Sequence, residues 1–522
     1  MASITRETSL LSLPTELLQA ILSLLEPFDL AACAKTCREL ASSSYDDIIW
    51  GPIVNACAGE RVIAPAPLQS FRSLYVSLFP YWFLTQHRIW FADTAPSGKL
   101  LVARYIPTMG CITAYQVVAV TARSSSDFSF WEKDREVIIQ NFHPTYNVDT
   151  NQPVLKLDAD TSVDQATAQT LRYDREVPME IATNSGLHSS FMLCRALLDG
   201  AIYEGAAVWP STIFPATSRA RNTSHDGFRS VGHRPSNRHE ISSNNFRIRK
   251  WAEYGTSSSS SSSFSGTGSR ISAALGIGLP WFMNDNSSSN SSTSRDAMLR
   301  PRIPEHIASY SSLPVESYTA SAEKPWQGIW CGDYNGHGCE FLLITQPSQE
   351  DAKPLPAGMD FMMSQVYGGE HTEEERTNGT PPPDITNTTT TDDETEVENA
   401  ASSSSRRVQN LDQGPTGRLE AIKLTGDTNI PLGKYSFIAP DIGNEGLIRV
   451  ADEHPFQGSR VVRSAGHIAE RGFSDDRYTP SQLILISHNR LAQYWQSFRH
   501  ISYYERVNLD SLLPLSLDEA NS

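Results

Sequence analysis

Cysteine is scarce in this sequence, and the few cysteines present form no recognisable pattern. Seven occur among 522 residues. No two form a C-x-x-C pair, and no histidine and cysteine cluster has the spacing of zinc ligands. The odd number and irregular spacing predict reduced thiols, which are typical of a reducing compartment. We therefore expect an intracellular protein, cytoplasmic and/or nuclear, with no metal site.

Long apolar runs are also missing. No stretch approaches the roughly 18 consecutive apolar residues of a membrane-spanning helix. The first ten residues, MASITRETSL, lack the charged start and apolar centre of a signal peptide. We expect no membrane partner.

Basic residues are outnumbered by acidic ones, and the imbalance is uneven along the chain. The sequence has 43 lysines and arginines against 59 aspartates and glutamates, a net charge of −16. Residues 350–398 hold 13 acidic and two basic residues, whereas residues 219–250 hold two acidic and eight basic residues. Because binding to nucleic acid in general requires a basic surface, the overall charge predicts no nucleic-acid partner.

Common catalytic motifs are absent as well. The sequence has no P-loop, no G-x-G-x-x-G, no H-E-x-x-H and no G-x-S-x-G. Cys331 and His337 lie near each other in the sequence, but a thiol nucleophile and its base must also meet in space. We expect no catalytic residues, no cofactor and no enzymatic activity.

Two tracts are too polar to form a core of their own. Residues 216–322 contain SSSSSSS and NSSSNSSTS, and residues 347–416 contain TPPPDITNTTTTDDETEVE. Their low hydrophobicity cannot offset the entropy lost on ordering. Both are predicted to be long disordered inserts.

The remaining sequence predicts an α+β protein that is mainly β. Residues 10–57 carry helical periodicity. Short β-rich runs bounded by turn residues occupy residues 82–215, 324–346 and 417–508. A sheet of so many strands exposes its edges unless it closes, so we expect one antiparallel β-barrel interrupted by the two inserts.

A short connecting helix is predicted between these parts, over residues 66–81. Apolar residues recur there at three- and four-residue spacing, and Pro80 would end the helix. These residues are Phe71, Leu74, Tyr75, Leu78 and Phe79.

The N-terminal helical segment is more apolar than a small unit can bury. A helix opened by Pro14 places one apolar row at Leu17, Ile21 and Leu24. A second row adjoins it at Leu18, Leu22 and Leu25. A unit of about 40 residues is near the lower limit of independent stability, and its small core can cover one row. The other row must be buried by the rest of the chain or by a partner.

The stretch LPTELLQAILSLLEPFDLAACAKTCREL, followed by Trp50, is similar to an F-box. F-boxes are three-helix modules that dock on the Skp adaptor of cullin-RING ubiquitin ligases. This resemblance implies a Skp adaptor as partner, and cullin through it. The implied adaptor contacts are Leu13, Pro14, Leu17, Leu18 and Ile21.

Four blocks of the β-rich part carry a second resemblance. WQGIWCGDYNGHGCEFLLI, LEAIKLTGDTNIPLGKYSF, GHIAERGF and FRHISYYERV are similar to the substrate-recognition domain of the F-box-only-thirty-one family, also described as a cyclin-D-binding domain. This resemblance implies a domain that binds a protein or peptide carrying a degradation signal.

Two glycine-rich loops give candidate substrate-binding residues. The loop GDYNGHG favours a tight connection between two strands, and TGDTNIPLG favours a second turn-rich loop. If both open on one end of the barrel, their side chains would line its mouth. The alternative is that they only make turns, and that His467 is a packed histidine. The candidates are His337, Gly338, Asp427, Asn429 and His467.

Together these observations predict a non-catalytic substrate receptor of a Skp–cullin–F-box ubiquitin ligase. Two alternatives stay open. The barrel could bind a small apolar ligand, unless large side chains fill it. The chain could also be an adaptor-bound scaffold that promotes no turnover.

Overall fold

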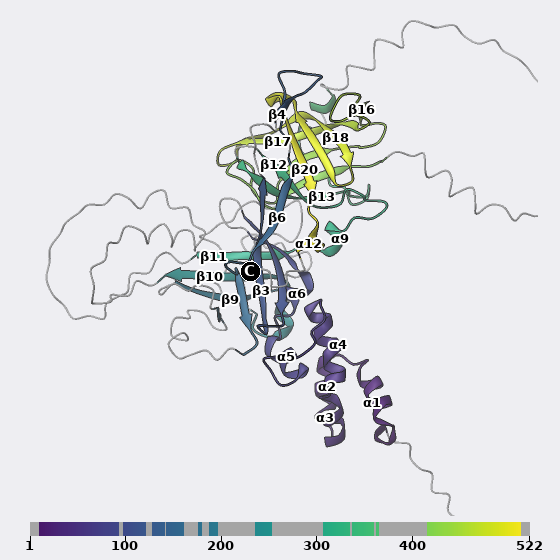
Figure 1. Ribbon diagram of the computed structural model, residues 1–522, viewed down its shortest axis with the longest axis vertical. Coiled ribbons are helices and arrows are strands. Elements are labelled where there is room, and N and C mark those ends of the chain that lie inside the picture. The colour runs from purple at the N-terminus through teal and green to yellow at the C-terminus, as the bar shows by residue number, and fades with distance from the viewer. Residues whose placement is uncertain are drawn as a thin grey trace, which may run out of the picture. The chain divides into compact units, whose positions relative to one another are not determined.

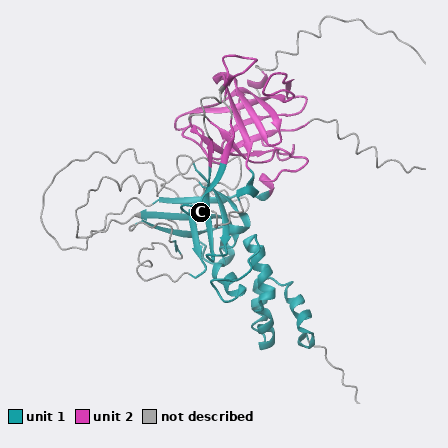
Figure 2. Cartoon of the chain, in the orientation of Figure 1, with its two compact units in different colours: residues 1–118, 146–315, 508–522 teal, residues 119–145, 316–507 magenta. Residues whose placement is uncertain are grey.

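The computed structural model describes residues 10–92, 98–121, 128–140, 142–160, 176–179, 187–196, 235–252, 306–334, 337–359, 362–364 and 415–512. The chain divides into two compact units (Figures 1 and 2). Unit 1 comprises residues 1–118, 146–315 and 508–522, and unit 2 comprises residues 119–145 and 316–507. Each unit has its own sheet and its own core, described separately below.

Unit 1 begins with a helical module. After a 3₁₀ turn over Leu10–Ser12, its helices are α1 (Thr15–Leu22), α2 (Pro27–Cys33), α3 (Arg38–Ser44) and α4 (Asp47–Ala58). Three helices were predicted, so α4 is an addition. Trp50, which follows the stretch similar to an F-box, lies inside this fourth helix.

Local sequence signals explain where these helices begin and end. Pro14 and Pro27 stand at the starts of α1 and α2, where a missing N–H costs nothing. The Asp46 carboxylate accepts a hydrogen bond from the N–H of Ile48 and caps α4. Gly59 ends α4 at φ +71°, a left-handed conformation that favours glycine.

One row of the first helix forms the core of the module. Leu18 and Leu22 are buried with Leu30, Ile49 and Trp50. The indole Nε1–H of Trp50 donates to the carbonyl of Ser44 at 2.7 Å, so the only polar atom of this buried ring is satisfied. The row that contains Leu18 therefore packs in the core of the module.

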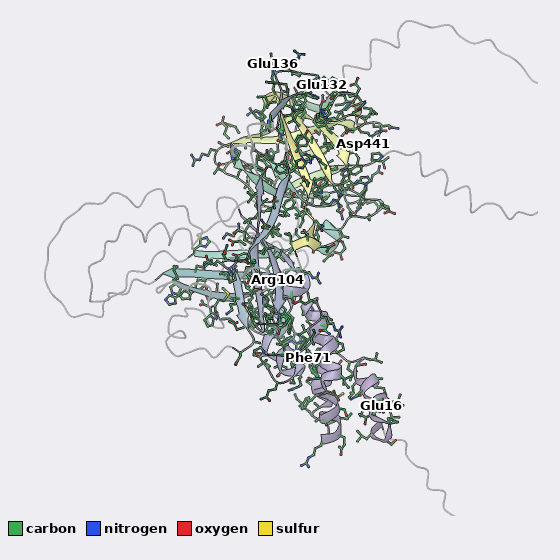
Figure 3. All side chains as sticks on the ribbon, viewed as in Figure 1. Glu16, Phe71, Arg104, Glu132, Glu136 and Asp441 are labelled. Carbon is green, nitrogen blue, oxygen red and sulfur yellow. The ribbon has the colours of Figure 1, made fainter. Side chains whose placement is uncertain are left out.

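The connecting helix continues from this module. Its observed range is Phe71–Leu78 (α5), and it begins with a capping box between Ser70 and Ser73. The N–H of Phe71, a residue labelled in Figure 3, donates to the Asp47 carboxylate. The distance is 2.9 Å, and this hydrogen bond ties α5 to α4. Helix α6 (Phe83–His87) follows.

Helices α4 to α6 pack on a nine-stranded sheet. Its order is β6-β3-β2-β1-β11-β10-β9-β8, with β7 paired to β3, among the described residues. The strands are β1 (Ile89–Ala92), β2 (Lys99–Ile106), β3 (Cys111–Thr121), β6 (Pro144–Asp149), β7 (Leu155–Asp158), β8 (Val177–Met179), β9 (Leu187–Arg195), β10 (Ile241–Ala252) and β11 (His306–Ser312). One continuous core joins the helices to the sheet, with Val54, Leu74, Trp82, Trp90 and Phe246 among its members.

Unit 2 is a closed antiparallel barrel. Its strand order is β12-β13-β14-β15-β17-β18-β19-β20, and the pairing of β20 with β12 closes it. The strands are β12 (Gly328–Asp333), β13 (Cys339–Thr345), β14 (Leu419–Lys423), β15 (Tyr435–Ala439), β17 (Arg460–Glu470), β18 (Ser474–Ser487), β19 (Arg490–Trp495) and β20 (His500–Arg506). Strand β16 (Leu447–Val450) pairs with β17, and the hairpin of β4 (Phe128–Phe130) and β5 (Ile138–Gln140) joins β20. Short helices α9 (Val315–Tyr318) and α12 (Leu509–Leu512) flank this part of the sequence.

Large side chains fill most of the barrel interior. Trp326, Trp330, Phe437, Leu483 and Tyr504 are buried in one cluster. Gly466 on β17 leaves room for another ring, because a Cβ there would lie 2.1 Å from an atom of Trp495. This filled core speaks against a barrel that encloses a small apolar ligand.

The fold class is confirmed, but the extent of the barrel was predicted wrongly. Strands from residues 82–121 form the separate sheet of unit 1, and within 82–215 only the β4–β5 segment belongs to unit 2. Strands β10 and β11 lie inside residues 216–322, which were predicted to be a disordered insert. Most of the rest of that tract and of residues 347–416 lies outside the described residues. None of the described helices has the length and apolar character needed to cross a bilayer.

Truncating a leucine should change the stability of the helical module much more in the buried row of α1 than in the exposed row. Leu18→Ala removes a side chain that is 6% exposed and should destabilise helices α1 to α4 by about 2–5 kcal/mol. Leu17→Ala is the matched control, because Leu17 is 53% exposed and its loss should cost less than about 0.5 kcal/mol. Amide hydrogen exchange of these helices in the full chain measures both effects. Equal protection in the two variants would contradict this assignment of the rows.

Candidate functional site

The first candidate surface is the outer row of α1, which includes Leu24 in the turn directly after the helix. Leu17, Ile21 and Leu24 are 53%, 40% and 84% exposed. The helix is held in place from its other side, where the Gln19 amide donates to the Asp46 carboxylate at 2.7 Å. The row is therefore presented by a packed helix. Single exposed leucines are ordinary on protein surfaces, but a continuous row is typical of an interaction site.

The predicted adaptor contacts divide between this surface and the core. Leu13, Pro14, Leu17 and Ile21 are exposed on one side of the module. Leu18 is the exception, because its side chain is buried against Leu22 and Trp50. Its burial argues against a direct contact with the adaptor, which stays a prediction. It supports the exposed row from below and offers a partner almost no surface.

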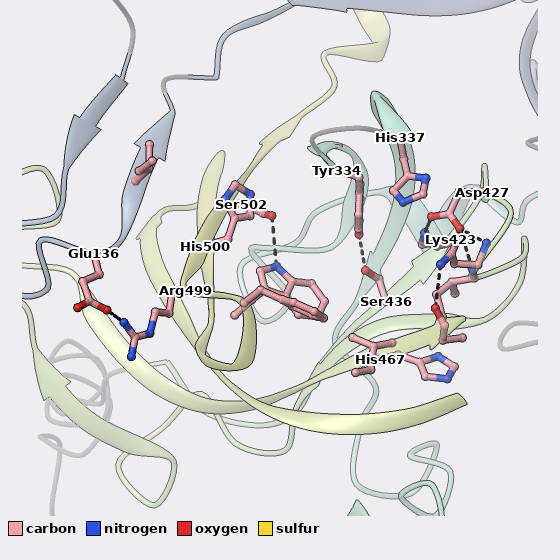
Figure 4. A pocket seen from close by; sticks show the side chains of 17 residues that line it. Glu136, Tyr334, His337, Lys423, Asp427, Ser436, His467, Arg499, His500 and Ser502 are labelled. Atoms are coloured by element: carbon pink, nitrogen blue, oxygen red, sulfur yellow. Dashed lines mark hydrogen bonds and ion pairs between the residues drawn. The ribbon is translucent and has the colours of Figure 1, made fainter. Parts of the chain in front are cut away.

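The second candidate site is a pocket of about 770 Å³ at one end of the barrel (Figure 4). His337, Asp427, Asn429 and His467 all line it, although they come from three separate parts of the sequence. Both predicted loops therefore open on the same pocket. Whether these residues bind a substrate remains a prediction.

The β12–β13 hairpin brings His337 to this pocket. Tyr334 and Gly338 close the turn with a backbone hydrogen bond of 3.0 Å from the N–H of Tyr334 to the carbonyl of Gly338. Gly338 has φ +87°, which favours glycine. Gly338 does not line the pocket, so its observed part is the turn geometry that places His337.

The loop after β14 supplies the two other predicted residues. The Asp427 carboxylate accepts hydrogen bonds from the N–H groups of Asn429 and Ile430. The Asn429 side-chain amide donates to the carbonyl of Ala469 at 2.9 Å, which ties the loop to β17. Both side chains hold the loop in shape, as the turn interpretation predicted, and both also face the pocket.

A buried lysine organises the charges of the pocket. The Lys423 ammonium lies 2.7 Å from the Asp427 carboxylate and 2.8 Å from that of Glu340, and its side chain is 2% exposed. It also lies 4.5 Å from the ring centre of Tyr334, within the range of a cation–π interaction. One positive charge thus faces two carboxyl groups whose side chains are at most 10% exposed.

These two carboxyl groups are shifted in opposite directions. Burial raises the pKa of Glu340 to about 8, and the attraction of Lys423 only partly opposes this effect. Burial also acts on Asp427, but the charge and hydrogen bond of Lys423 and the backbone N–H groups overcome it and lower its pKa to about 2. At neutral pH Glu340 is therefore the protonated partner and Asp427 the ionised one. The cluster is then neutral as a whole.

His467 lies beside this cluster on β17. Its Nδ1–H donates to the carbonyl of Tyr435 at 2.9 Å, and its ring stacks on Tyr478 with 4.5 Å between ring centres. Nε2 lies 3.3 Å from the Asp476 carboxylate. Burial lowers the pKa of His467, and its hydrogen bonds oppose the shift. It is a packed histidine with one edge in the pocket.

The opposite side of the pocket combines an ion pair with apolar side chains. Arg499 contacts the Glu136 carboxylate there, as Figure 4 shows. Ile138 and Phe498 line the same side and remain 46% and 58% exposed. The pocket therefore has a polar wall and an apolar rim.

Sequence reasoning missed several residues of this site. Glu136 and Ile138 come from the β4–β5 hairpin, more than 180 residues before β12. No sequence pattern linked that hairpin to the barrel. Lys423 and Glu340 did carry a signal, because each is a charged residue inside an apolar strand. Such residues are rarely buried unless they are paired.

Family comparisons agree with this division of the chain. Residues 10–55 match the family model described as F-box-like, and residues 310–511 match the model described as Cyclin D1 binding domain. One segment of the chain is thus similar to F-box-like domains and another to Cyclin D1 binding domains. The resemblances read from the sequence are thereby confirmed. A search of curated proteins found no match to the chain.

The two domains coincide with the two candidate surfaces. The F-box-like domain contains α1 with its exposed row, and the Cyclin D1 binding domain contains every strand of the closed barrel. F-box domains are typical of adaptor-binding substrate receptors, which are not themselves catalysts.

The protonated Glu340 predicts a specific pH dependence of stability. Its pKa rises from 4.5 to about 8 on folding, so between these values the folded chain holds one more proton than the unfolded chain. The stabilisation from this group is therefore complete below pH 4.5 and is lost as the pH rises to about 8. Asp427, with a pKa of about 2, contributes no change in this window.

Glu340→Gln is the variant that isolates this effect, because glutamine keeps the shape and cannot ionise. We expect the unfolding free energy of the wild type, relative to that of Glu340→Gln, to fall steadily from pH 5 to pH 8. Urea unfolding of both proteins followed by tryptophan fluorescence measures it. A difference that stays constant across this range would contradict the protonation assignment.

Proposed function

We propose that this chain is the substrate receptor of a Skp–cullin–F-box ubiquitin ligase, acting in the cytoplasm and/or the nucleus. The F-box-like domain binds the Skp adaptor and, through it, cullin. The barrel binds a protein or peptide that carries a degradation signal. The ligase core supplies the ubiquitin chemistry, and the chain performs none itself.

The observation that carries this proposal is the exposed row on α1. Leu17 and Ile21 on α1, Leu13 just before it and Leu24 just after it are each at least 37% exposed, whereas Leu18 and Leu22 of the same helix are buried. Covering four such side chains contributes roughly 6–12 kcal/mol, at about 1.5–3 kcal/mol each. This is comparable to the estimated ~4–15 kcal/mol that association costs, so polar contacts around the row must add to it.

The function of the barrel end is to hold the substrate near the conjugating enzyme. Fixing two reactants in one complex makes their reaction effectively intramolecular. The pocket suits this role, since its wall offers the partly exposed Asp427 and Asn429 to polar groups and its rim offers apolar side chains. His337 lies in an exposed turn at this end, where it is accessible to a bound segment.

Affinity capture under proteasome inhibition tests the adaptor half of the proposal. The variant is Leu17→Asp together with Ile21→Asp, which adds charge to the exposed row and leaves the buried row unchanged. We expect it to lose the Skp and cullin subunits, because an unpaired charge at a buried contact costs several kcal/mol. Partners bound by the barrel should still be captured.

A double variant at other exposed apolar positions provides the control. Ile63 and Val76 are 86% and 54% exposed in unit 1, so Ile63→Asp with Val76→Asp should capture both subunits as the wild type does. Retention of Skp by the Leu17 and Ile21 variant would refute the proposed interface. Half-lives of the captured partners that do not change when this chain is depleted would favour the scaffold alternative.

A further inference from the structure

Among the described residues of unit 2, strand β4 leaves an edge of the sheet unpaired close to the pocket. Among the described residues, β4 (Phe128–Phe130) pairs only with β5, and β5 in turn runs parallel to the start of β20. A strand with a single neighbour leaves the N–H and C=O groups of its other edge available. The closed barrel itself has no such edge, so the added hairpin creates one.

Hydrogen-bond alternation shows which groups of β4 face outward. The N–H of Trp131 donates to the carbonyl of Val137 at 3.0 Å, just beyond the strand pair. In an antiparallel ladder, hydrogen-bonded and non-hydrogen-bonded pairs alternate. Ser129 and Ile139 therefore form the next hydrogen-bonded pair. The backbone groups of Phe128 and Phe130 point away from β5.

The hairpin that presents this edge is firmly attached to the barrel. Trp131 is 3% exposed, and its Nε1–H donates to the Glu453 carboxylate at 3.1 Å. The Glu132 carboxylate accepts a hydrogen bond from the N–H of His454 at 3.1 Å. Glu132 and Glu136, which lie between the two strands, are labelled in Figure 3. The edge is thus preorganised.

Apolar side chains surround the edge and lead to the pocket. Phe130 is 68% exposed and lies directly opposite Ile138, which is 46% exposed. Ile138 also lines the pocket, together with the exposed Phe498. Natural sheets usually protect an edge with charged residues or proline. β4 has neither, since its sequence is Phe-Ser-Phe.

We propose that an extended, apolar segment of a substrate protein adds a strand to the free edge of β4. Its backbone pairs with Phe128 and Phe130, its alternate side chains cover Phe130 and Ile138, and its continuation enters the neighbouring pocket. The assignment of this segment to a degradation substrate rests on the proposed function. The addition of a strand to β4 is independent of that function.

The dimensions of the edge favour a peptide over a second copy of the chain. A stable interface between two proteins buries more than about 1,000 Å². Three edge residues and two flanking side chains cannot provide that area alone. A peptide binds in this way through main-chain hydrogen bonds, with pockets for its alternate side chains. The adjoining pocket of about 770 Å³ provides the space for such side chains.

The test uses a phage-displayed library of random twelve-residue peptides, selected on the full chain. The selected peptides are synthesised, and their affinity is measured by fluorescence anisotropy. Phe130→Pro removes the outward N–H and the aromatic ring together, and proline is tolerated where a strand N–H faces solvent. We expect it to weaken binding about tenfold or more, whereas the control Ser129→Ala changes affinity less than about twofold.

Two further measurements separate the contribution of the backbone hydrogen bonds from that of the Phe130 ring. Phe130→Ala keeps the backbone donor and should weaken binding by an intermediate factor. Hydrogen exchange at Phe128 and Phe130 should slow when the peptide binds. Peptides that bind Phe130→Pro as tightly as the wild type, or a library that yields no binder, would overturn the proposal. A concentration-dependent dimer abolished by Phe130→Pro would also overturn it, by assigning the edge to a second copy.

Skp capture measured on the same proteins distinguishes this proposal from the proposed function. Phe130→Pro should capture the adaptor as the wild type does. If the wild type itself captures no adaptor but the peptide results stand, the ligase role fails and the strand-addition site survives.

Discussion

The packing of Leu18 and Leu22 against Trp50 is the interaction on which the N-terminal surface depends. It orients α1 so that the neighbouring row, Leu17 and Ile21, faces outward. A module of about 40 residues would be marginally stable by itself. Here α4 extends from the module into the core of unit 1, where Val54 is fully buried. The exposed row is therefore carried by a much larger folded body.

Aromatic contacts continue this support beyond the module. Trp50 lies 5.3 Å from Tyr75 between ring centres, Tyr75 stacks on Trp82 at 6.4 Å, and Trp82 lies 5.6 Å from Tyr105 on β2. The Trp82 Nε1–H also donates to the carbonyl of Tyr75 at 3.0 Å. These contacts fix the helical module to the sheet of unit 1, so an adaptor bound to α1 would be held in one orientation relative to that sheet.

In unit 2 the comparable constraint is the single buried ammonium of Lys423. Because it faces two carboxyl groups, one of them retains its proton. Burial raises the pKa of Glu340 to about 8, whereas the charge and hydrogen bond of Lys423 outweigh burial at Asp427 and lower its pKa to about 2. This arrangement keeps the polar wall of the pocket neutral while it presents charged and hydrogen-bonding atoms. A pocket of this kind selects by the position of polar groups more than by net charge.

Sequence periodicity predicted the two rows of α1 correctly, because 3.6 residues per turn fixes which side chains share a face. It could not decide which row is inside, since both rows consist of large aliphatic side chains. The two turn loops, GDYNGHG and TGDTNIPLG, were also predicted from their turn residues. They meet at one pocket because the barrel is closed. The assignment of strands to sheets failed, because pairing between distant segments leaves little local signal. Strand β10 shows the difficulty: Phe246 and Ile248 alternate towards the core, but the surrounding tract is dominated by serine and arginine.

The central claim is that the outer row of α1 stays in water until another subunit covers it. Hydroxyl-radical footprinting by mass spectrometry, with and without purified Skp adaptor, measures this directly. The account predicts that Leu17, Ile21 and Leu24 are oxidised in the free chain and protected in the complex, while Ile63 is oxidised equally in both. Leucines already protected in the free chain, or unprotected after the adaptor binds, would contradict it.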